Sequence, residues 1–266
     1  MTGPLGAVFL LAAAVFAAGP ETPLPGQPPE RLETTLLDDT TAIPLIPADR
    51  KAAKSSNGWV RSSASLLFYD ETASLANEIP LRTEEEQAGG RLIVREVLGG
   101  ASANRRFGWT LERSTVWNPQ RTKALSSRRL LRVFGSAGKE LWSSTEADLP
   151  ETGEPVIFSS DGETLLLALH FESSWAASAR NYMGAVLIEA GSLPRLQSLT
   201  LTTNGRYAMV RWTVPDQSST HTFLDIAAKK RKDIPSSDLK LGLARIDEDG
   251  KVYSGKKVVF DFAAQK

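Results

Sequence analysis

Hydrophobic and polar positions alternate along most of the chain between residues 57 and 262. Phe107, Trp109 and Leu111 alternate with smaller or polar neighbours, and the same pattern returns around Trp212. Alternation with a period of two residues predicts β-strands that bury one face. The run 165–169 is apolar throughout, which predicts a central strand covered on both faces. We expect Trp109 and Trp212 in the core, because both fall on apolar faces.

The strand patterns are closely and regularly spaced. We count about seventeen strand candidates, or roughly one per 12 residues, which is typical of all-β folds. The segment Thr83–Glu86 resembles a helix-capping box, but two glycines follow at once and allow one helical turn at most. The sequence therefore predicts an all-β, antiparallel protein.

Two tight turns with matching flanks lie 43 residues apart, at Asp161–Gly162 and Asn204–Gly205. Each separates two strand patterns. Such turns need positive φ, which Gly and Asn tolerate. The spacing falls within the period of about 40–45 residues found in β-propeller blades. We interpret the two turns as equivalent positions in neighbouring sheets.

A second kind of turn recurs in Tyr69–Leu75, Phe134–Glu140 and Ile246–Val252. Together the two kinds resemble the turns of bacterial periplasmic propellers of the TolB-like and WD40-like kind. In those proteins a Ser-x-Asp-Gly turn joins inner strands and an Asp-x-x-Gly-Lys turn joins outer ones. The resemblance implies a β-propeller-like fold of about four to five blades, complete or incomplete. The alternatives are a β-sandwich or two small β domains.

The segment Leu5–Ala18 is almost wholly apolar. Its 14 residues are fewer than the roughly 20 of a membrane-spanning helix and are typical of a signal peptide. Small residues at Val15 and Ala17 predict cleavage after Ala17, and hence export to the periplasm or the exterior. The alternative is a membrane tether through an uncleaved signal.

Five prolines within Gly19–Glu30 predict an extended linker after the signal. We therefore divide the chain into a signal peptide (1–17), a Pro-rich linker and transitional segment (18–54) and a β-propeller-like domain (55–266). No membrane span is predicted in the mature chain.

Composition removes several classes of function. Lys+Arg and Asp+Glu both number 31, so the net charge gives no support to nucleic-acid binding. The chain has no Cys and only two His, which excludes thiolate chemistry and disfavours a metal site. No catalytic motif and no cofactor signature is recognisable, so we predict no catalytic residues, metal or cofactor.

Three residues of a polar, small-residue insertion are the candidate binding residues. Glu172, Trp175 and Arg180 lie within 172–180, which we interpret as a loop between two strands. Binding residues concentrate on loops carried by a rigid scaffold, and Trp175 is flanked there by opposite charges.

Two arginine pairs and one histidine have open interpretations. Arg105–Arg106 and Arg128–Arg129 suit either an acidic partner or solvated strand ends. His170 lies two positions before Glu172, with which it would share a proton or a metal ion. The alternative is a hydrogen-bonded histidine at the end of a strand.

The sequence favours an exported, non-catalytic β-repeat module for binding or scaffolding, with a protein or a glycan as partner. The resemblance implies this role. The alternative is a carboxylate-based hydrolase acting on glycans. A hydrolase needs two carboxylates converging in one pocket, whereas a binding module needs a grooved surface with exposed Trp or Arg.

Overall fold

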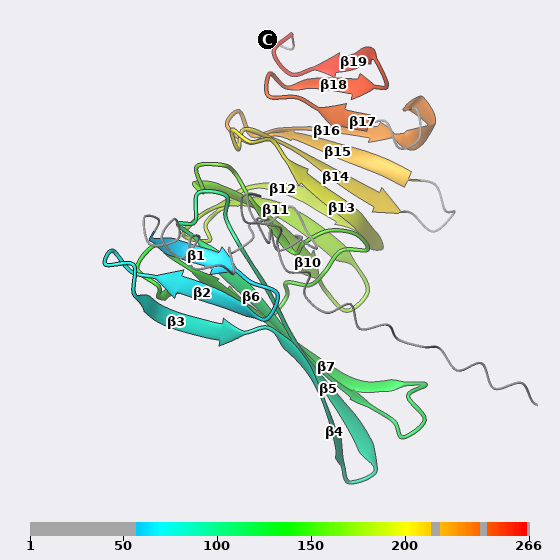
Figure 1. Ribbon diagram of the computed structural model, residues 1–266. Coiled ribbons are helices and arrows are strands. Elements are labelled where there is room, and N and C mark those ends of the chain that lie inside the picture. Colours follow the sequence, from blue (N-terminus) through cyan, green and yellow to red (C-terminus); the bar gives the residue numbers. More distant parts are fainter. Residues whose placement is uncertain (1–56, 214–218, 240–243, 265–266) are drawn as a thin grey trace, which may run out of the picture. The chain divides into compact units, whose positions relative to one another are not determined.

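Five antiparallel sheets follow one another along the chain in this computed structural model, which describes residues 57–213, 219–239 and 244–264 (Figure 1). Each sheet is built from strands that are consecutive in sequence and joined by turns, the simplest antiparallel connection. All described residues belong to one unit, Glu33–Lys266. The predicted signal peptide (1–17) and linker (18–54) lie outside the described residues.

The first two sheets contain three and five strands. The first sheet consists of β1 (Gly58–Arg61), β2 (Ser65–Tyr69) and β3 (Leu75–Pro80). The second consists of β4 (Arg82–Ala88), β5 (Arg91–Ala101), β6 (Gly108–Trp117), β7 (Ala124–Phe134) and β8 (Glu140–Ser144).

The other three sheets contain four, four and three strands. The third sheet consists of β9 (Val156–Phe158), β10 (Thr164–His170), β11 (Trp175–Asn181) and β12 (Val186–Leu193). The fourth consists of β13 (Arg195–Leu201), β14 (Tyr207–Thr213), β15 (Ser219–Asp225) and β16 (Lys230–Pro235). A short 3₁₀ turn, η1 (Ser236–Asp238), precedes the fifth sheet of β17 (Ala244–Ile246), β18 (Lys251–Ser254) and β19 (Lys257–Asp261).

Each sheet packs on the next sheet along the chain, and every such contact has its own hydrophobic core. Trp59 and Phe134 lie in the core between the first two sheets, and Leu131 and Leu167 in the core between the second and third. Leu166 and Trp212 lie in the core between the third and fourth sheets. Phe223 and Val252 lie in the core between the last two. Successive side chains of β10 thus enter different cores, as predicted for 165–169. Trp109 and Trp212 are both buried, which confirms their predicted place in the core.

The two turns singled out in the sequence are equivalent in the structure. One joins β9 to β10 and the other joins β13 to β14. Gly162 and Gly205 have φ of +74° and +70°, in the left-handed region that favours glycine. Gly162 lies against Phe107, at the end of the preceding β5–β6 turn, and Gly205 lies against Ser159 in the preceding β9–β10 turn.

Two further turns share this arrangement. Arg105, between β5 and β6, has φ +61° where the other turns have glycine. Gly250, between β17 and β18, has φ +81° and lies against Tyr207 of the preceding sheet. The prediction that Ile246–Val252 is a turn of the second, outer kind is therefore wrong. The sequence of this turn fits both the inner and the outer pattern. Its packing against Tyr207 of the preceding sheet identifies it as an inner turn.

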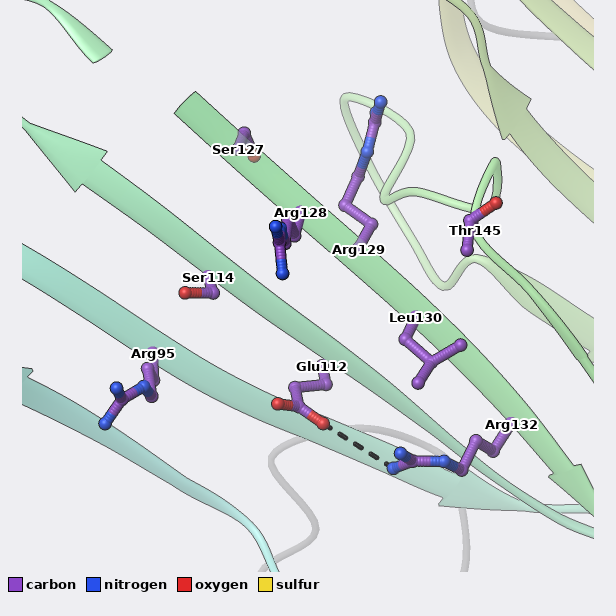
Figure 2. Close-up of a pocket in the computed structure, with 9 residues that line it drawn as sticks. All are labelled: Arg95, Glu112, Ser114, Ser127, Arg128, Arg129, Leu130, Arg132 and Thr145. Carbon is purple, nitrogen blue, oxygen red and sulfur yellow. Dashed lines mark ion pairs between the residues drawn. The ribbon is translucent and has the colours of Figure 1, made fainter. Parts of the chain in front are cut away.

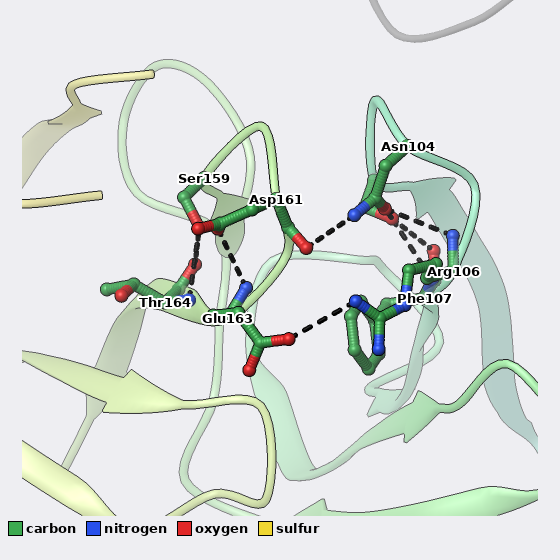
Figure 3. A network of polar contacts seen from close by, with 8 residues as sticks. Asn104, Arg106, Phe107, Ser159, Asp161, Glu163 and Thr164 are labelled. Carbon is green, nitrogen blue, oxygen red and sulfur yellow. Dashed lines mark hydrogen bonds and ion pairs between the residues drawn. The ribbon is translucent and has the colours of Figure 1, made fainter. Parts of the chain in front are cut away.

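Polar contacts link the first two of these turns (Figure 3). Asn104 Nδ2 donates a hydrogen bond to the backbone oxygen of Asp161. Arg106 Nη1 lies 3.2 Å from Glu163 Oε1. Within its own turn, the Asp161 carboxylate accepts hydrogen bonds from the Ser159 hydroxyl and from the Glu163 backbone N–H, and both lower its pKa.

Similar contacts continue to the later turns. Ser160 Oγ donates to the backbone oxygen of Thr203 at 2.7 Å. Asn204 Nδ2 donates to the backbone oxygen of Glu248 at 3.0 Å. In return, the Glu248 carboxylate accepts from the backbone N–H groups of Thr203 and Asn204. The repeated turn is thus a repeated contact between sheets.

The fold is all-β, antiparallel and propeller-like, as predicted, with five successive sheets and a core between each neighbouring pair. The segment Thr83–Glu86, whose capping-box pattern allowed one helical turn at most, forms no helix: it lies in β4 and pairs with β5 along its whole length. Tertiary pairing outweighs a short capping signal. In the part of the chain that the structure covers, no helix has the length and apolar character needed to cross a membrane.

Candidate binding groove on the second sheet

The second sheet has the longest strands in the described part of the chain. Strands β5, β6 and β7 contain 11, 10 and 11 residues, whereas no strand of the other sheets exceeds eight. At about 3.4 Å per residue, such strands extend well beyond the neighbouring three- and four-stranded sheets. One half of each long strand packs in the cores described above. The other half is exposed in β7 over 124–128 and mostly half-buried in β5 and β6.

Cross-strand pairing brings three polar side chains into one row in this exposed half. Arg95 of β5 lies opposite Ser114 of β6, and Ser114 lies opposite Arg128 of β7. In the next row towards the core, Glu112 lies opposite Leu130. Because side chains on one face of a sheet recur every second residue, these five share a face.

These residues form the floor and sides of a groove with a volume of about 750 Å³ (Figure 2). Arg132, Ser127, Arg129 and Thr145 complete its lining. Charged and polar side chains predominate, and Leu130 is its one large apolar residue. An open polar groove of this kind suits a segment of a larger molecule better than a small apolar ligand, which needs an enclosing pocket.

The groove carries an excess of positive charge. Arg132 is partly neutralised by Glu112 and Glu140, at 3.5 and 3.6 Å between nitrogen and oxygen. Arg95 pairs with Glu86 of β4 at 3.2 Å, in a solvent-exposed contact. Arg128 is exposed and forms no ion pair with any residue that the structure describes. The groove therefore offers at least one unpaired guanidinium to an anionic group.

Strand β7 also has a free edge beside the groove. Its pairing with β8 covers only Leu131–Phe134. Over 124–130, β7 pairs with β6 on one side and with no described strand on the other. Residues 124–128 are all exposed, and 129 and 130 are half-buried.

On the opposite face of the same strands, charged side chains form a closed cluster. Asp148, which is nearly buried, accepts from Arg129 at 2.7 Å and lies 3.3 Å from both Arg113 Nε and His170 Nδ1. His170 also contacts Arg129 and stacks on Trp175, with ring centroids 4.4 Å apart. Burial lowers the pKa of His170, and the Arg129 charge lowers it further. This cluster ties the second sheet to the third.

The structure shows where each of the two arginine pairs lies and what it contacts. Arg128 and Arg129 alternate along β7 and both line the groove, but Arg129 also enters the cluster with Asp148 (Figure 2). Arg105 and Arg106 belong to the β5–β6 turn, where Arg106 pairs with Glu163. For His170, the structure confirms the hydrogen-bonded histidine at a strand end.

The structure does not bring the three predicted binding residues together. Glu172 is exposed in a tight turn in which the Phe171 N–H donates to the Ser174 oxygen. Trp175 is half-buried at the start of β11. Arg180 is near the end of the same strand, on the opposite face because it is five positions away.

The interpretation of 172–180 as a loop is wrong for most of its length. Ala177, Ser178 and Ala179 are buried in β11, between the second and fourth sheets. Small residues are suited to this position because neighbouring sheets pack closely on both faces. Arg180 bonds Ser178 Oγ and the Gly184 oxygen, and burial lowers its pKa. Contact of Glu172, Trp175 or Arg180 with a partner stays a prediction.

Among the described residues there is no candidate metal site, and the groove offers no pair of carboxylates. No three His, Asp or Glu side chains of this part of the chain are grouped to hold a metal ion. The groove contains a single carboxylate, that of Glu112.

No family model and no curated protein sequence matches the chain. Among solved structures, the β-propeller domain of the Trilobed protease from Pyrococcus furiosus is 10% identical, with a TM-score of 0.31 over 62% of this chain and 44% of that one. The Dos1 propeller is 11% identical, with a TM-score of 0.38 over 68% and 46%. The WD40 domain of Toxoplasma gondii coronin is 9% identical, with a TM-score of 0.30 over 68% and 60%. This chain spans less than half the length of the first two. The propeller-like assignment rests on its own sheets and turns.

Proposed function

We propose that the protein is a non-catalytic binding module whose contact surface is the groove of the second sheet. The observation that carries the proposal is the row formed by Arg95, Ser114 and Arg128 on strands that extend beyond the neighbouring sheets. The row offers hydroxyl and guanidinium donors, of which Arg128 forms no ion pair with a described residue, and the strands that carry them are paired along their length. Such a site selects a partner without any chemistry of its own.

The alternative, a glycan hydrolase acting through two carboxylates, has less support at this site. General acid and base catalysis needs a second carboxylate about 5–9 Å from the first. Glu112 is the single carboxylate of the groove, and it pairs with Arg132.

Filling the groove tests its role directly. A library of displayed twelve-residue peptides is selected on the wild-type protein and counter-selected on Ser114→Tyr, which places a bulky ring between Arg95 and Arg128. We expect peptides that bind the wild type and lose at least tenfold in affinity for the variant. Ser114 is half-buried on the open face of the groove, so the substitution should leave the unfolding temperature nearly unchanged, which a thermal melt verifies. Peptides that bind both proteins equally, or no binders at all, would contradict the proposal.

We propose further that this module is exported, since the apolar segment Leu5–Ala18 and the small residues before the Ala17–Ala18 bond fit a cleaved signal. N-terminal sequencing of the mature protein is expected to begin at Ala18. An intact Met1 on membrane-bound protein would favour the uncleaved tether instead.

A further inference from the structure

We infer that the partner is an extended, acidic segment of another protein, which adds to the free edge of β7 over residues 124–130. The inference rests on the proposed function of the groove and names the chemistry of its ligand. Three features of the second sheet carry it: an unpaired strand edge, an unneutralised arginine beside that edge and a single apolar position two residues further on.

The free edge decides the class of partner. An exposed strand edge presents N–H and C=O groups at regular intervals, and the backbone of another extended polypeptide matches that spacing. Strand β8 already occupies this side of β7 at Leu131–Phe134 and leaves it at Ser144. An added segment would continue the line of β8 past Thr145, which lines the groove at this point. Glycans and nucleic acids lack such a backbone.

The side chains beside the edge decide the charge of the segment. Residues on adjacent strands interact mainly with those directly opposite on the same face. A residue placed opposite Arg128 meets an exposed guanidinium without a described ion pair, so an acidic side chain is favoured there. A residue placed two positions along meets the half-buried side chain of Leu130, so an apolar side chain is favoured. The recognised pattern is therefore an acidic and an apolar residue two positions apart.

The opposite face of the edge does not favour a second acidic residue. Arg129 lies there, but Asp148 and His170 already occupy its guanidinium. An acidic residue on that face would meet the Asp148 carboxylate, which is held against Arg129. The acidic side chains of the segment are therefore expected only on its groove face, which every second residue of an extended chain occupies.

A defined probe tests this inference. The probe is a fluorescein-labelled peptide, Thr-Glu-Thr-Val-Thr-Glu-Thr, whose acidic and apolar residues share one face when extended. We expect saturable binding to the full-length protein, followed by fluorescence anisotropy at low salt. Arg128→Gln should weaken binding about tenfold to a hundredfold, the range for loss of a charge-assisted hydrogen bond. Arg91→Gln is the matched control, because Arg91 is exposed on β5, outside the groove, and should leave affinity unchanged.

Three altered peptides separate this mode of binding from simple charge attraction. Replacing both Glu by Gln tests the acidic requirement. Methylating the backbone nitrogen of alternate residues, in each of the two possible sets, removes donors and keeps every charge. At least one methylated set should abolish binding if the segment adds as a strand.

The outcomes distinguish the inference from the proposed function. Unchanged affinity for both methylated sets would overturn strand addition, and unchanged affinity of Arg128→Gln would overturn the acidic contact. Either result would leave the groove as a contact surface if Ser114→Tyr still removed peptide binding. Loss of the Ser114→Tyr effect would instead count against the groove itself.

Discussion

Asp148→Asn is expected to lower the free energy of unfolding by about 3 kcal/mol, because it removes the one carboxylate that holds two arginines and a histidine between the second and third sheets. The Asp148 side chain is 9% exposed, and that of its partner Arg129 is 19% exposed. Asparagine keeps the shape but not the charge, so the Arg129 guanidinium would lose its carboxylate partner, and Arg113 would keep only Glu96, 3.2 Å away. Urea unfolding at neutral pH measures the difference.

Glu163→Gln is the control for Asp148→Asn. It breaks another ion pair between the same two sheets, that of Glu163 with Arg106, but both side chains are about half exposed. Exposed pairs contribute little, so we expect a loss below about 1 kcal/mol. Equal losses for the two variants would show that burial of the Asp148 cluster does not contribute to stability as the structure indicates.

Gly162→Ala is expected to cost about 3 kcal/mol, through two separate effects. A left-handed φ of +74° strains any residue with a Cβ by about 1–2 kcal/mol. The new Cβ would also lie 2.5 Å from two ring atoms of Phe107, which is buried and stacked on Phe158. Moving this ring disturbs the contact between the second and third sheets, and overpacking of this kind costs about 1–3 kcal/mol.

Gly90→Ala separates the two effects. Gly90 has φ +71°, close to that of Gly162, but a Cβ there meets no other atom within 4 Å. This variant should therefore lose only the conformational part, about 1 kcal/mol. If Gly162→Ala is no worse than Gly90→Ala, the turn does not pack on the preceding sheet as described, and the equivalence of the repeated turns loses its main support.

The repeated turns show where sequence reasoning succeeds and where it fails. Gly162 and Gly205 were predictable because a turn with positive φ selects glycine, and their spacing matches the length of one four-stranded sheet. Arg105 occupies the same position without glycine, so no local signal marks it. Gly250 carries the signal, but its turn also fits the outer pattern, and its place depends on contact with Tyr207.

The groove was only partly visible in the sequence. The adjacent Arg128 and Arg129 could be noticed, and alternation on a strand places them on opposite faces. Which face remains open depends on how far β7 extends beyond β8 and beyond the third sheet, and this is set by long-range pairing. The segment 172–180 was misjudged for a related reason. Small and polar residues are common both in loops and in strands packed closely between two sheets.

Hydrogen exchange measured with and without the acidic peptide tests the central claim most directly, because it compares the groove with the surface that the sequence favoured. We predict that the peptide slows exchange of backbone amides within 124–130 of β7 and leaves the turn that contains Glu172 unchanged. Protection confined to the neighbourhood of Glu172 and Trp175, with none in β7, would contradict the account.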